Sequence, residues 1–185
     1  CKDTPGFIGN RIGNYWMVVA QNEAIELGLD VEEADAIIGK PFGIPSTGIF
    51  GLLDLVGIDL MPTILRSLQN ATPEGDAVKH YDAEPALIAR MIAESRLGRK
   101  SGAGFVRLSP DRKSRDVTDL KTGDYRPQKA VSSESLDASG GDPSALMEHA
   151  GLGGRYASVV MEKALAYAAS LVPDIADTPD AVDEA

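Results

Sequence analysis

Three amide side chains near the start of the chain have the type and spacing to share one polar site. Asn10, Asn14 and Gln21 fall within roughly 40° of one another on a helix that turns ~100° per residue. An amide donates hydrogen bonds from its nitrogen and accepts them at its oxygen without carrying charge. Asn10 has a second interpretation, because asparagine often hydrogen-bonds to the backbone near the start of its own helix. The residues alone leave both interpretations open.

The helix that positions these amides is predicted to begin at Ile8. Its apolar side chains recur at the three- and four-residue spacing of a buried face, on the side away from the amides. These apolar residues are Ile8, Ile12, Tyr15, Trp16, Val19 and Leu27. A turn at Pro5 and Gly6 precedes the helix, and Gly28 is suited to end it. Asp30 is then expected to cap a short helix over residues 31–38.

Further helices are predicted beyond the glycine- and proline-rich loop at residues 39–48. The nearly continuous apolar segment from Phe50 to Leu68 is expected to be buried on most sides or to form a subunit contact. Pro62 either kinks this segment or opens a separate helix. Residues 71–82 predict a surface loop, and the next short helix is expected to end at Gly98.

The second half of the chain predicts a small β-hairpin followed by helices. A strand is expected after GRKSGAGF, residues 98–105, and KTGDY, residues 121–125, is a hairpin-type turn. Residues 128–143 are rich in Ser, Gly, Asp and Lys, which is typical of a linker. Helices are expected again at residues 143–149 and 155–171.

A weak internal repeat relates the two long predicted helices. Aligning Arg155 with Arg11 places Gly154 where Asn10 stands. We therefore expect a mostly α-helical fold with a small β-hairpin. The expected division is a first helical domain at residues 1–107, a hairpin and linker at 108–142, and the truncated first helices of a second, similar domain at 143–185.

The composition narrows the classes of function. The chain has 185 residues, of which 43% are hydrophobic, a net charge of −10 and a sequence pI of about 4.6. Binding a nucleic acid backbone needs clustered Lys and Arg, so the charge argues against such a partner. No apolar run reaches the ~18 residues of a membrane span. Cys1 is the single cysteine, no metal-ligand spacing occurs, and a reducing cytoplasm is expected.

Three separated motifs occur in order along the chain: CKDTPGFIGNR at residues 1–11, GIPSTGIFGLLDLVGID at 43–59 and GRKSGAGF at 98–105. Together they resemble the C-terminal helical domain of L-3-hydroxyacyl-CoA dehydrogenases, over residues 1 to about 105. The linker, KTGDYRP and PDIADTPDAVDEA further resemble long bacterial fatty-oxidation proteins. In those, a dehydrogenase unit carries two such helical domains and is fused to an enoyl-CoA hydratase module.

The resemblance implies oxidation of a 3-hydroxyacyl-CoA to a 3-ketoacyl-CoA, with hydride passing to NAD. It also implies a Rossmann domain, with the acyl-CoA held in the cleft between that domain and the helical one. No GxGxxG follows a predicted strand here, so the pyrophosphate cradle has no candidate. The family's catalytic histidine lies in the Rossmann domain, and neither His80 nor His149 matches its motif. We therefore expect the fragment to be inactive alone and not to bind NAD tightly.

Two residues of this chain match functional positions of the family. Asn10 matches the asparagine of PGFxxNR, which contacts the substrate near the reacting carbon. A neutral NH₂ there would donate to the oxygen being oxidised and hold it toward the base. Lys100, in GRKSG, matches a lysine that lies near bound NAD when the domains close, whereas a basic residue at a glycine turn is more often simply solvated. Asn14 and Gln21 match no motif and are expected to be surface or interdomain polar groups.

Two alternatives differ from the dehydrogenase interpretation. The first is a helical interaction module, in which the segment from Phe50 to Leu68 pairs helical domains within one chain or in a homodimer. The second is a related NAD-dependent dehydrogenase that uses the same helical domain for another hydroxy acid. The sequence of the missing upstream domain would discriminate between these enzymes.

Overall fold

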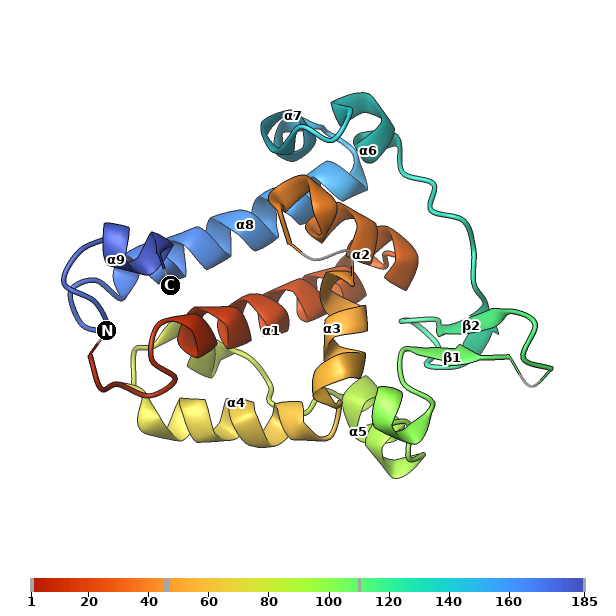
Figure 1. Ribbon diagram of the computed structural model, residues 1–185, viewed down its shortest axis with the longest axis horizontal. Helices are drawn as coiled ribbons and strands as arrows, with labels where there is room; N and C mark the ends of the chain where they lie inside the picture. Colours follow the sequence, from red (N-terminus) through yellow and green to blue (C-terminus); the bar gives the residue numbers. More distant parts are fainter. Residues whose placement is uncertain (1, 45–46, 110, 185) are drawn as a thin grey trace.

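The protein is mostly helical, with one small sheet at an end of the molecule (Figure 1). The computed structural model describes residues 2–44, 47–109 and 111–184. Its α-helices are α1 (Gly9–Leu27), α2 (Val31–Ile38), α3 (Gly48–Val56), α4 (Leu60–Ala71), α5 (Ala86–Ala93), α6 (Glu134–Ser139), α7 (Pro143–Glu148), α8 (Leu152–Ser170) and α9 (Asp180–Asp183). The 3-10 helices are η1 (Lys40–Phe42), η2 (Ala77–His80) and η3 (Arg99–Ser101). The predicted fold class is confirmed. Cys1 and part of the predicted 39–48 loop, residues 45–46, lie outside the described residues.

The first helix begins one residue after the predicted Ile8 and ends before Gly28 as predicted, and the second begins where expected. α1 ends at Gly28, whose backbone is left-handed and whose N–H bonds to the Ala24 and Ile25 carbonyls. α2 follows Asp30, but the predicted cap hydrogen bond from the Asp30 side chain is wrong. The Asp30 carboxylate instead accepts hydrogen bonds from Arg126 and Lys129 at 2.8 and 2.9 Å. A pair of cations therefore draws this side chain away from the helix end.

Pro62 opens a separate helix and does not kink a single one. It lies in the first turn of α4, where a missing N–H costs nothing, and α4 runs at 92° to α3. Five apolar side chains of this segment are buried in the chain's own core, namely Phe50, Leu53, Ile58, Leu65 and Leu68, whereas Leu55 and Leu60 are 55% and 46% exposed. Among the described residues no single helix is long and apolar enough to cross a membrane; α3 and α4 meet those criteria only as a bent pair.

Two of the predicted boundaries are wrong. α5 ends at Ala93 instead of Gly98, because Ser95 adopts a left-handed backbone and the Arg96 N–H turns back to the Met91 carbonyl. The predicted linker at residues 128–143 contains the helix α6. Ser133 and Ser135 are buried at the start of that helix, so its packing uses small polar side chains that the sequence pattern does not mark as core.

The small sheet has three antiparallel strands in the order β1 (Val106–Leu108), β2 (Arg115–Thr118) and β3 (Tyr125–Pro127). Val117 pairs with Val106 on one side and with Arg126 on the other. The strand after GRKSGAGF and the KTGDY turn are both confirmed. The sheet is therefore one strand larger than the hairpin around KTGDY, since β1 joins its outer edge.

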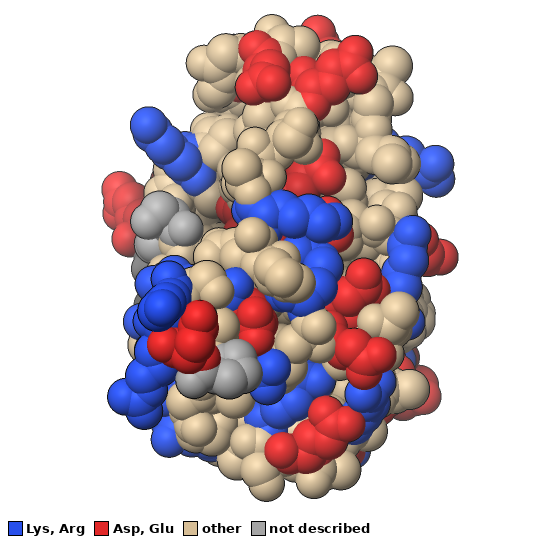
Figure 2. Space-filling model, turned by 90° about the vertical axis from the view of Figure 1, so that its right-hand side faces the viewer, with Lys and Arg blue, Asp and Glu red and all other residues tan. Residues whose placement is uncertain are grey.

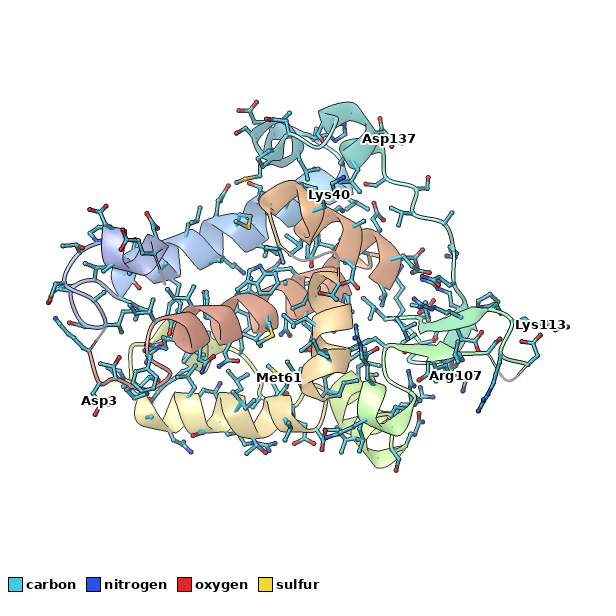
Figure 3. All side chains as sticks on the ribbon, in the orientation of Figure 1. Asp3, Lys40, Met61, Arg107, Lys113 and Asp137 are labelled. Carbon is cyan, nitrogen blue, oxygen red and sulfur yellow. The ribbon has the colours of Figure 1, made fainter. Side chains whose placement is uncertain are left out.

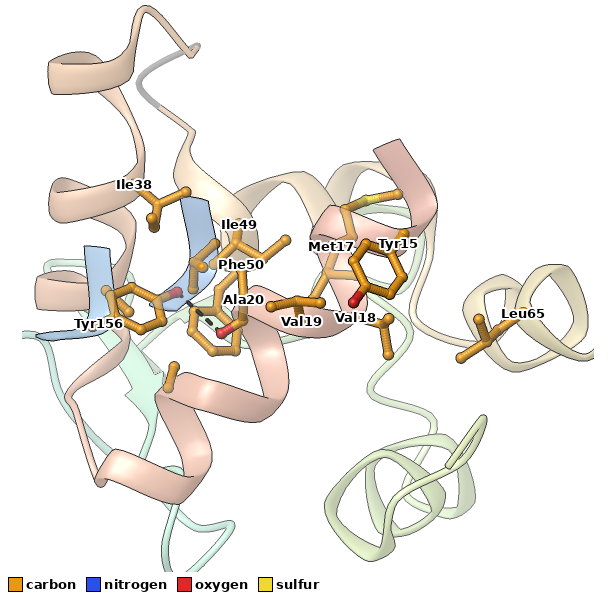
Figure 4. Close-up of a cluster of buried hydrophobic side chains, with 14 of the residues drawn as sticks. Tyr15, Met17, Val18, Val19, Ala20, Ile38, Ile49, Phe50, Leu65 and Tyr156 are labelled. Atoms are coloured by element: carbon orange, nitrogen blue, oxygen red, sulfur yellow. Dashed lines mark hydrogen bonds between the residues drawn. The ribbon is translucent and has the colours of Figure 1, made fainter. Parts of the chain in front are cut away.

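The core lies chiefly where α8 runs alongside α1 (Figure 1). Tyr156 of α8 is fully buried, and its hydroxyl donates to the Ala20 carbonyl of α1 at 3.0 Å (Figure 4). Residues of α1, α2, α3 and α8 belong to one continuous cluster of buried apolar side chains. Burying each large apolar side chain contributes about 1.5–3 kcal/mol, so this cluster stabilises the helical part. The division into domains at residues 107 and 142 stays a prediction.

Candidate functional site

Asn10 lies in the first turn of α1 with its side chain exposed. The helix start has no side-chain cap, and the Asn10 side chain makes no hydrogen bond to any residue in the described parts of the chain. The turn before the helix holds the site in place, since the Phe7 N–H bonds to the Thr4 carbonyl and the Arg11 N–H to the Gly6 carbonyl. The amide of Asn10 is therefore available to an outside group, and its role in binding substrate stays a prediction.

Arg11, the next residue, is buried, and sequence reasoning missed its two side-chain partners. Its Nε donates to the Tyr167 hydroxyl of α8 at 2.6 Å, and its guanidinium forms an ion pair with Asp76, just before η2. The Tyr167 hydroxyl donates in turn to Asp76 Oδ1 at 2.9 Å. Three segments far apart in sequence thus converge directly behind Asn10. A buried charge is stable only with such partners.

Aromatic stacking extends this network along α1. The rings of Tyr15 and Tyr167 stack with their centroids 3.9 Å apart, and Tyr81 meets Tyr15 edge-on at 5.8 Å. Burial, followed by the neighbouring Tyr81, raises the pKa of Tyr15 to about 12. Burial also raises the pKa of Tyr167, although Arg11 opposes that shift. Both phenols are therefore protonated near neutral pH and serve as hydrogen-bond donors and packing groups.

The other two amides do not join Asn10 in one site. Gln21 is only 6% exposed, so the expectation that it is a surface or interdomain group is wrong. Gln21 and the half-buried Asn14 line a cavity of about 20 Å³ between α1, α4 and α5, together with Met61 and Ile88. α4 and α5 cover this part of α1, which a helical projection of α1 alone does not reveal. The side of α1 that carries the three amides is therefore exposed at Asn10 and covered by other helices at Gln21.

Lys100 lies in η3, well separated from the start of α1 in Figure 1. Its side chain is 45% exposed, and Nζ forms an ion pair with Asp59 Oδ1 at 2.5 Å. The hydrogen bond from Lys100 lowers the pKa of Asp59. Asp59 therefore partly neutralises the lysine. An exposed but paired cation fits an auxiliary contact to NAD and not a complete cofactor site, and its role stays a prediction.

A buried carboxylate explains why two of the sequence motifs belong together. Asp54, at the end of GIFGLLD, accepts hydrogen bonds from the Phe105 and Val106 N–H groups at 2.7 and 2.9 Å. A Cβ on Gly104 would lie 2.0 Å from Asp54 Oδ1, so only glycine fits beside this carboxylate. Burial raises the pKa of Asp54, and these two backbone hydrogen bonds oppose the shift. The GRKSGAGF turn is therefore attached directly to α3.

Neither histidine lies close to Asn10 in a hydrogen-bonded arrangement. His80 is exposed at the end of η2. His149 Nδ1 accepts from the Gly151 N–H at 3.0 Å and lies 3.0 Å from Ser135 Oγ, which itself accepts from the Gly154 N–H. A Cβ on Gly154 would lie 2.0 Å from the His149 carbonyl oxygen. The position aligned with Asn10 thus lies in the first turn of α8 and packs against the backbone just before that helix.

The sequence profile of the 3-hydroxyacyl-CoA dehydrogenase C-terminal domain family matches residues 6–108, more than half of the chain. The chain belongs to this family. Both Asn10, on α1, and Lys100, in η3, lie within the matched region. No solved structure matches the chain.

Curated relatives extend the similarity beyond the matched domain. A putative fatty acid oxidation complex trifunctional enzyme from Rickettsia prowazekii is 33% identical over 95% of this chain, and its counterpart from Rickettsia felis is 34% identical over all of it. A probable 3-hydroxyacyl-CoA dehydrogenase from Bacillus subtilis is 31% identical over the whole chain. The chain spans about a quarter of the length of each of these relatives, at 24%, 25% and 24%.

Proposed function

We propose that this chain supplies the substrate side of an NAD-dependent L-3-hydroxyacyl-CoA dehydrogenase of fatty acid oxidation. Membership of the family supports the reaction class, and relatives named for fatty acid oxidation support the pathway. The proposed partners are an acyl-CoA and a Rossmann domain of a longer polypeptide, in which an enoyl-CoA hydratase module is also fused. A cytoplasmic location, and the start of a second helical domain at residues 143–185, belong to the same proposal.

The exposed amide of Asn10 is the observation that carries this proposal. It follows a turn held by backbone hydrogen bonds and precedes an arginine with buried partners, so its backbone position is fixed while its side chain remains available. In the proposed role the amide NH₂ donates to the substrate oxygen at the reacting carbon. Such a fixed donor acts without reorganisation when charge develops on that oxygen.

NAD, when bound, accepts the hydride, whereas this chain supplies position and charge. Lys100 is proposed to approach NAD when the two domains close, since its side chain is half exposed beside Asp59. One paired lysine cannot hold a dinucleotide. We therefore expect the 185 residues alone to show no NAD reduction with any hydroxyacyl-CoA and no tight NAD binding.

The proposal is tested by Asn10→Ala in the longer polypeptide that carries the Rossmann domain. Removal of one fixed donor to a reacting oxygen is expected to lower kcat about 100-fold or more. Asn70→Ala is the matched control, because Asn70 is an exposed asparagine on α4. Unchanged thermal unfolding of both variants would show that the loss comes from the site. An Asn10→Ala enzyme with the turnover of the Asn70→Ala enzyme would exclude the proposed role.

A helical interaction module is the second candidate function, and two exposed leucines favour it. Leu55 of α3 and Leu60 at the start of α4 are about half exposed, whereas the other apolar side chains of that segment are buried or half-buried. In this role they would contact another helical domain or a second copy of the chain. Light scattering of the wild-type chain and of Leu55→Ser is the test. A wild-type monomer at all concentrations would count against homodimer formation through this surface.

A further inference from the structure

Two adjoining hollows are lined by residues of the small sheet. Figure 1 shows this sheet at the end of the molecule away from the start of α1. Their volumes are about 520 and 800 Å³, within the range of about 300–1,000 Å³ that is usual for small-molecule sites. They share Leu108, Arg115 and Gln128. Arg115 on β2 therefore lines both hollows, which we call the sheet-side hollows.

Cations without partners concentrate at the sheet-side hollows. Within residues 2–44, 47–109 and 111–184, eleven of the 18 Lys and Arg side chains form ion pairs with carboxylates. Four of the other seven line these hollows: Arg99, Arg112, Lys113 and Arg115. Figure 2 shows Lys and Arg groups, interspersed with Asp and Glu, over the lower half of this end of the molecule, and Figure 3 shows Lys113 at the tip of the β1–β2 hairpin. This concentration of unpaired cations is a local exception in a chain whose net charge is −10.

The carboxylates around the sheet-side hollows are already bound to other groups. Asp54 accepts from two backbone N–H groups, as described above, and Asp35 accepts from the Phe50 and Gly51 N–H groups at 2.7 and 3.2 Å. Glu32 accepts from Arg126 at 2.7 and 2.8 Å. Arg107 donates to Asp116 and covers the Tyr125 ring, 3.8 Å from its centroid. The walls are thus held by internal contacts while the four cations remain free toward the hollows.

The same hollows also offer apolar surface. Leu108 and Val131 are 56% and 50% exposed. Both line the 800 Å³ hollow with Val31 and Val106. A ligand that fits must therefore combine an apolar or flat body with more than one negative charge. Guanidinium groups pair with phosphate and with carboxylate in a planar, two-bond geometry. A phosphate group carries the larger negative charge, which suits several neighbouring cations.

We propose that the sheet-side hollows bind a phosphorylated small molecule of nucleotide size, with Arg115 between its phosphate and its apolar body. Arg99 and the pair Arg112 and Lys113 contact the charged groups from the two sides of Arg115. The ligand reaches this surface against a repelling net charge, so the four cations must supply the local attraction. This proposal does not depend on the dehydrogenase role of Asn10, which lies at the other end of α1.

Binding of adenosine 3′,5′-bisphosphate, measured by titration calorimetry at low ionic strength, tests the proposal. The wild-type chain is expected to bind it saturably, with weaker binding as salt rises. Arg115→Gln is expected to weaken the affinity at least tenfold. Arg155→Gln, at an exposed arginine of α8 that forms no ion pair with the described residues, is the matched control and should change the affinity less than twofold. The Arg115 side chain makes no hydrogen bond to the described residues, so both variants should unfold at the wild-type temperature.

Three results would overturn the proposal. The first is the absence of saturable binding to the wild-type chain. The second is an equal loss of affinity in Arg115→Gln and Arg155→Gln, since that would indicate unspecific attraction. The third is binding to vesicles of phosphatidylglycerol that requires Arg115, without binding of the soluble bisphosphate. That outcome would identify a lipid headgroup as the source of the phosphate.

Discussion

Arg11 and Tyr167 are joined by a 2.6 Å hydrogen bond, although 156 residues separate them in the sequence. Arg11 follows Asn10 directly in the family's PGFxxNR motif, whereas Tyr167 lies in α8, outside the region that the family profile matches. The position of Asn10, the proposed substrate contact, therefore depends on a helix that lies outside the region matched by the family profile. Asp76 completes the arrangement by accepting from both residues.

Tyr167→Phe should destabilise the protein by about 1–3 kcal/mol, because it leaves the buried Arg11 Nε without a partner and removes one donor to Asp76. Chemical denaturation with circular dichroism would measure this loss. Leu165→Ala is the control, since Leu165 is 61% exposed on the same helix and its loss should cost less than about 0.5 kcal/mol. Equal stability of the two variants would mean that the hydroxyl contributes nothing.

Gly104→Ala should destabilise the protein strongly, whereas Gly13→Ala should stabilise it. The new methyl group at residue 104 would collide with the Asp54 carboxylate and separate it from the N–H groups of Phe105 and Val106. Gly13 lies inside α1 with open space around it, so alanine there should gain about 0.5–1 kcal/mol through helix propensity. Thermal unfolding of the two variants would compare them. A Gly104→Ala protein as stable as wild type would contradict the packing described for Asp54.

Asp35 should make stability depend on pH between about 4 and 7. Burial raises the pKa of Asp35 from its usual value to about 7, although the N–H groups at the start of α3 oppose the shift. The folded protein therefore binds a proton that the unfolded chain has released, and the resulting stability is full below about pH 4 and lost as the pH rises through 7.

Asp35→Asn removes this titration. Denaturation of both proteins at several pH values should show that wild type loses free energy of unfolding relative to the variant as the pH rises from 4 to 7. Comparing the two proteins cancels the pH dependence that comes from the titratable groups they share. Glu32 is one such group: burial raises its pKa, but its bonds to Arg126 and Lys129 outweigh burial and lower the pKa overall. A difference that does not change with pH would contradict the raised pKa of Asp35.

Lys100→Ala, in the longer polypeptide, should raise the KM for NAD several-fold and leave kcat nearly unchanged. A cation that only attracts the dinucleotide contributes to binding and not to the transition state. Lys121→Ala is the control, because Lys121 is exposed in the turn between β2 and β3. The cofactor role of Lys100 fails if both variants keep the wild-type KM.

Local patterns in the sequence were sufficient for the elements around Asn10. The apolar spacing of α1, the first-turn proline of α4 and the KTGDY turn each act over a few residues, so they could be predicted without knowledge of the fold. The linker was misjudged for the opposite reason. Its helix α6 packs through Ser133 and Ser135, whose burial depends on α8 and is not visible in hydrophobicity.

The candidate site was predictable only in part. Asn10 and Lys100 came from motif resemblance, and their exposure follows from the structure but their roles still rest on that resemblance. The burial of Gln21 and the partners of Arg11 depend on which helices cover α1. Arg11 itself had one signal, since an arginine in the first turns of a mostly apolar helix needs a carboxylate, but nothing in the sequence identified Asp76 as that carboxylate.

The two ends of the described chain are fastened together, and this limits how the protein can be divided. The Lys2 N–H bonds to the Ile175 carbonyl, and Lys2 Nζ pairs with Asp177 at 2.9 Å. A piece trimmed to residues 6–108 would keep Asn10 but lose Tyr167 and this clasp. A fragment meant to keep this site must therefore extend at least from residue 2 to residue 177. Fusing the shorter piece to another dehydrogenase would transfer Asn10 without the residues that hold it in place.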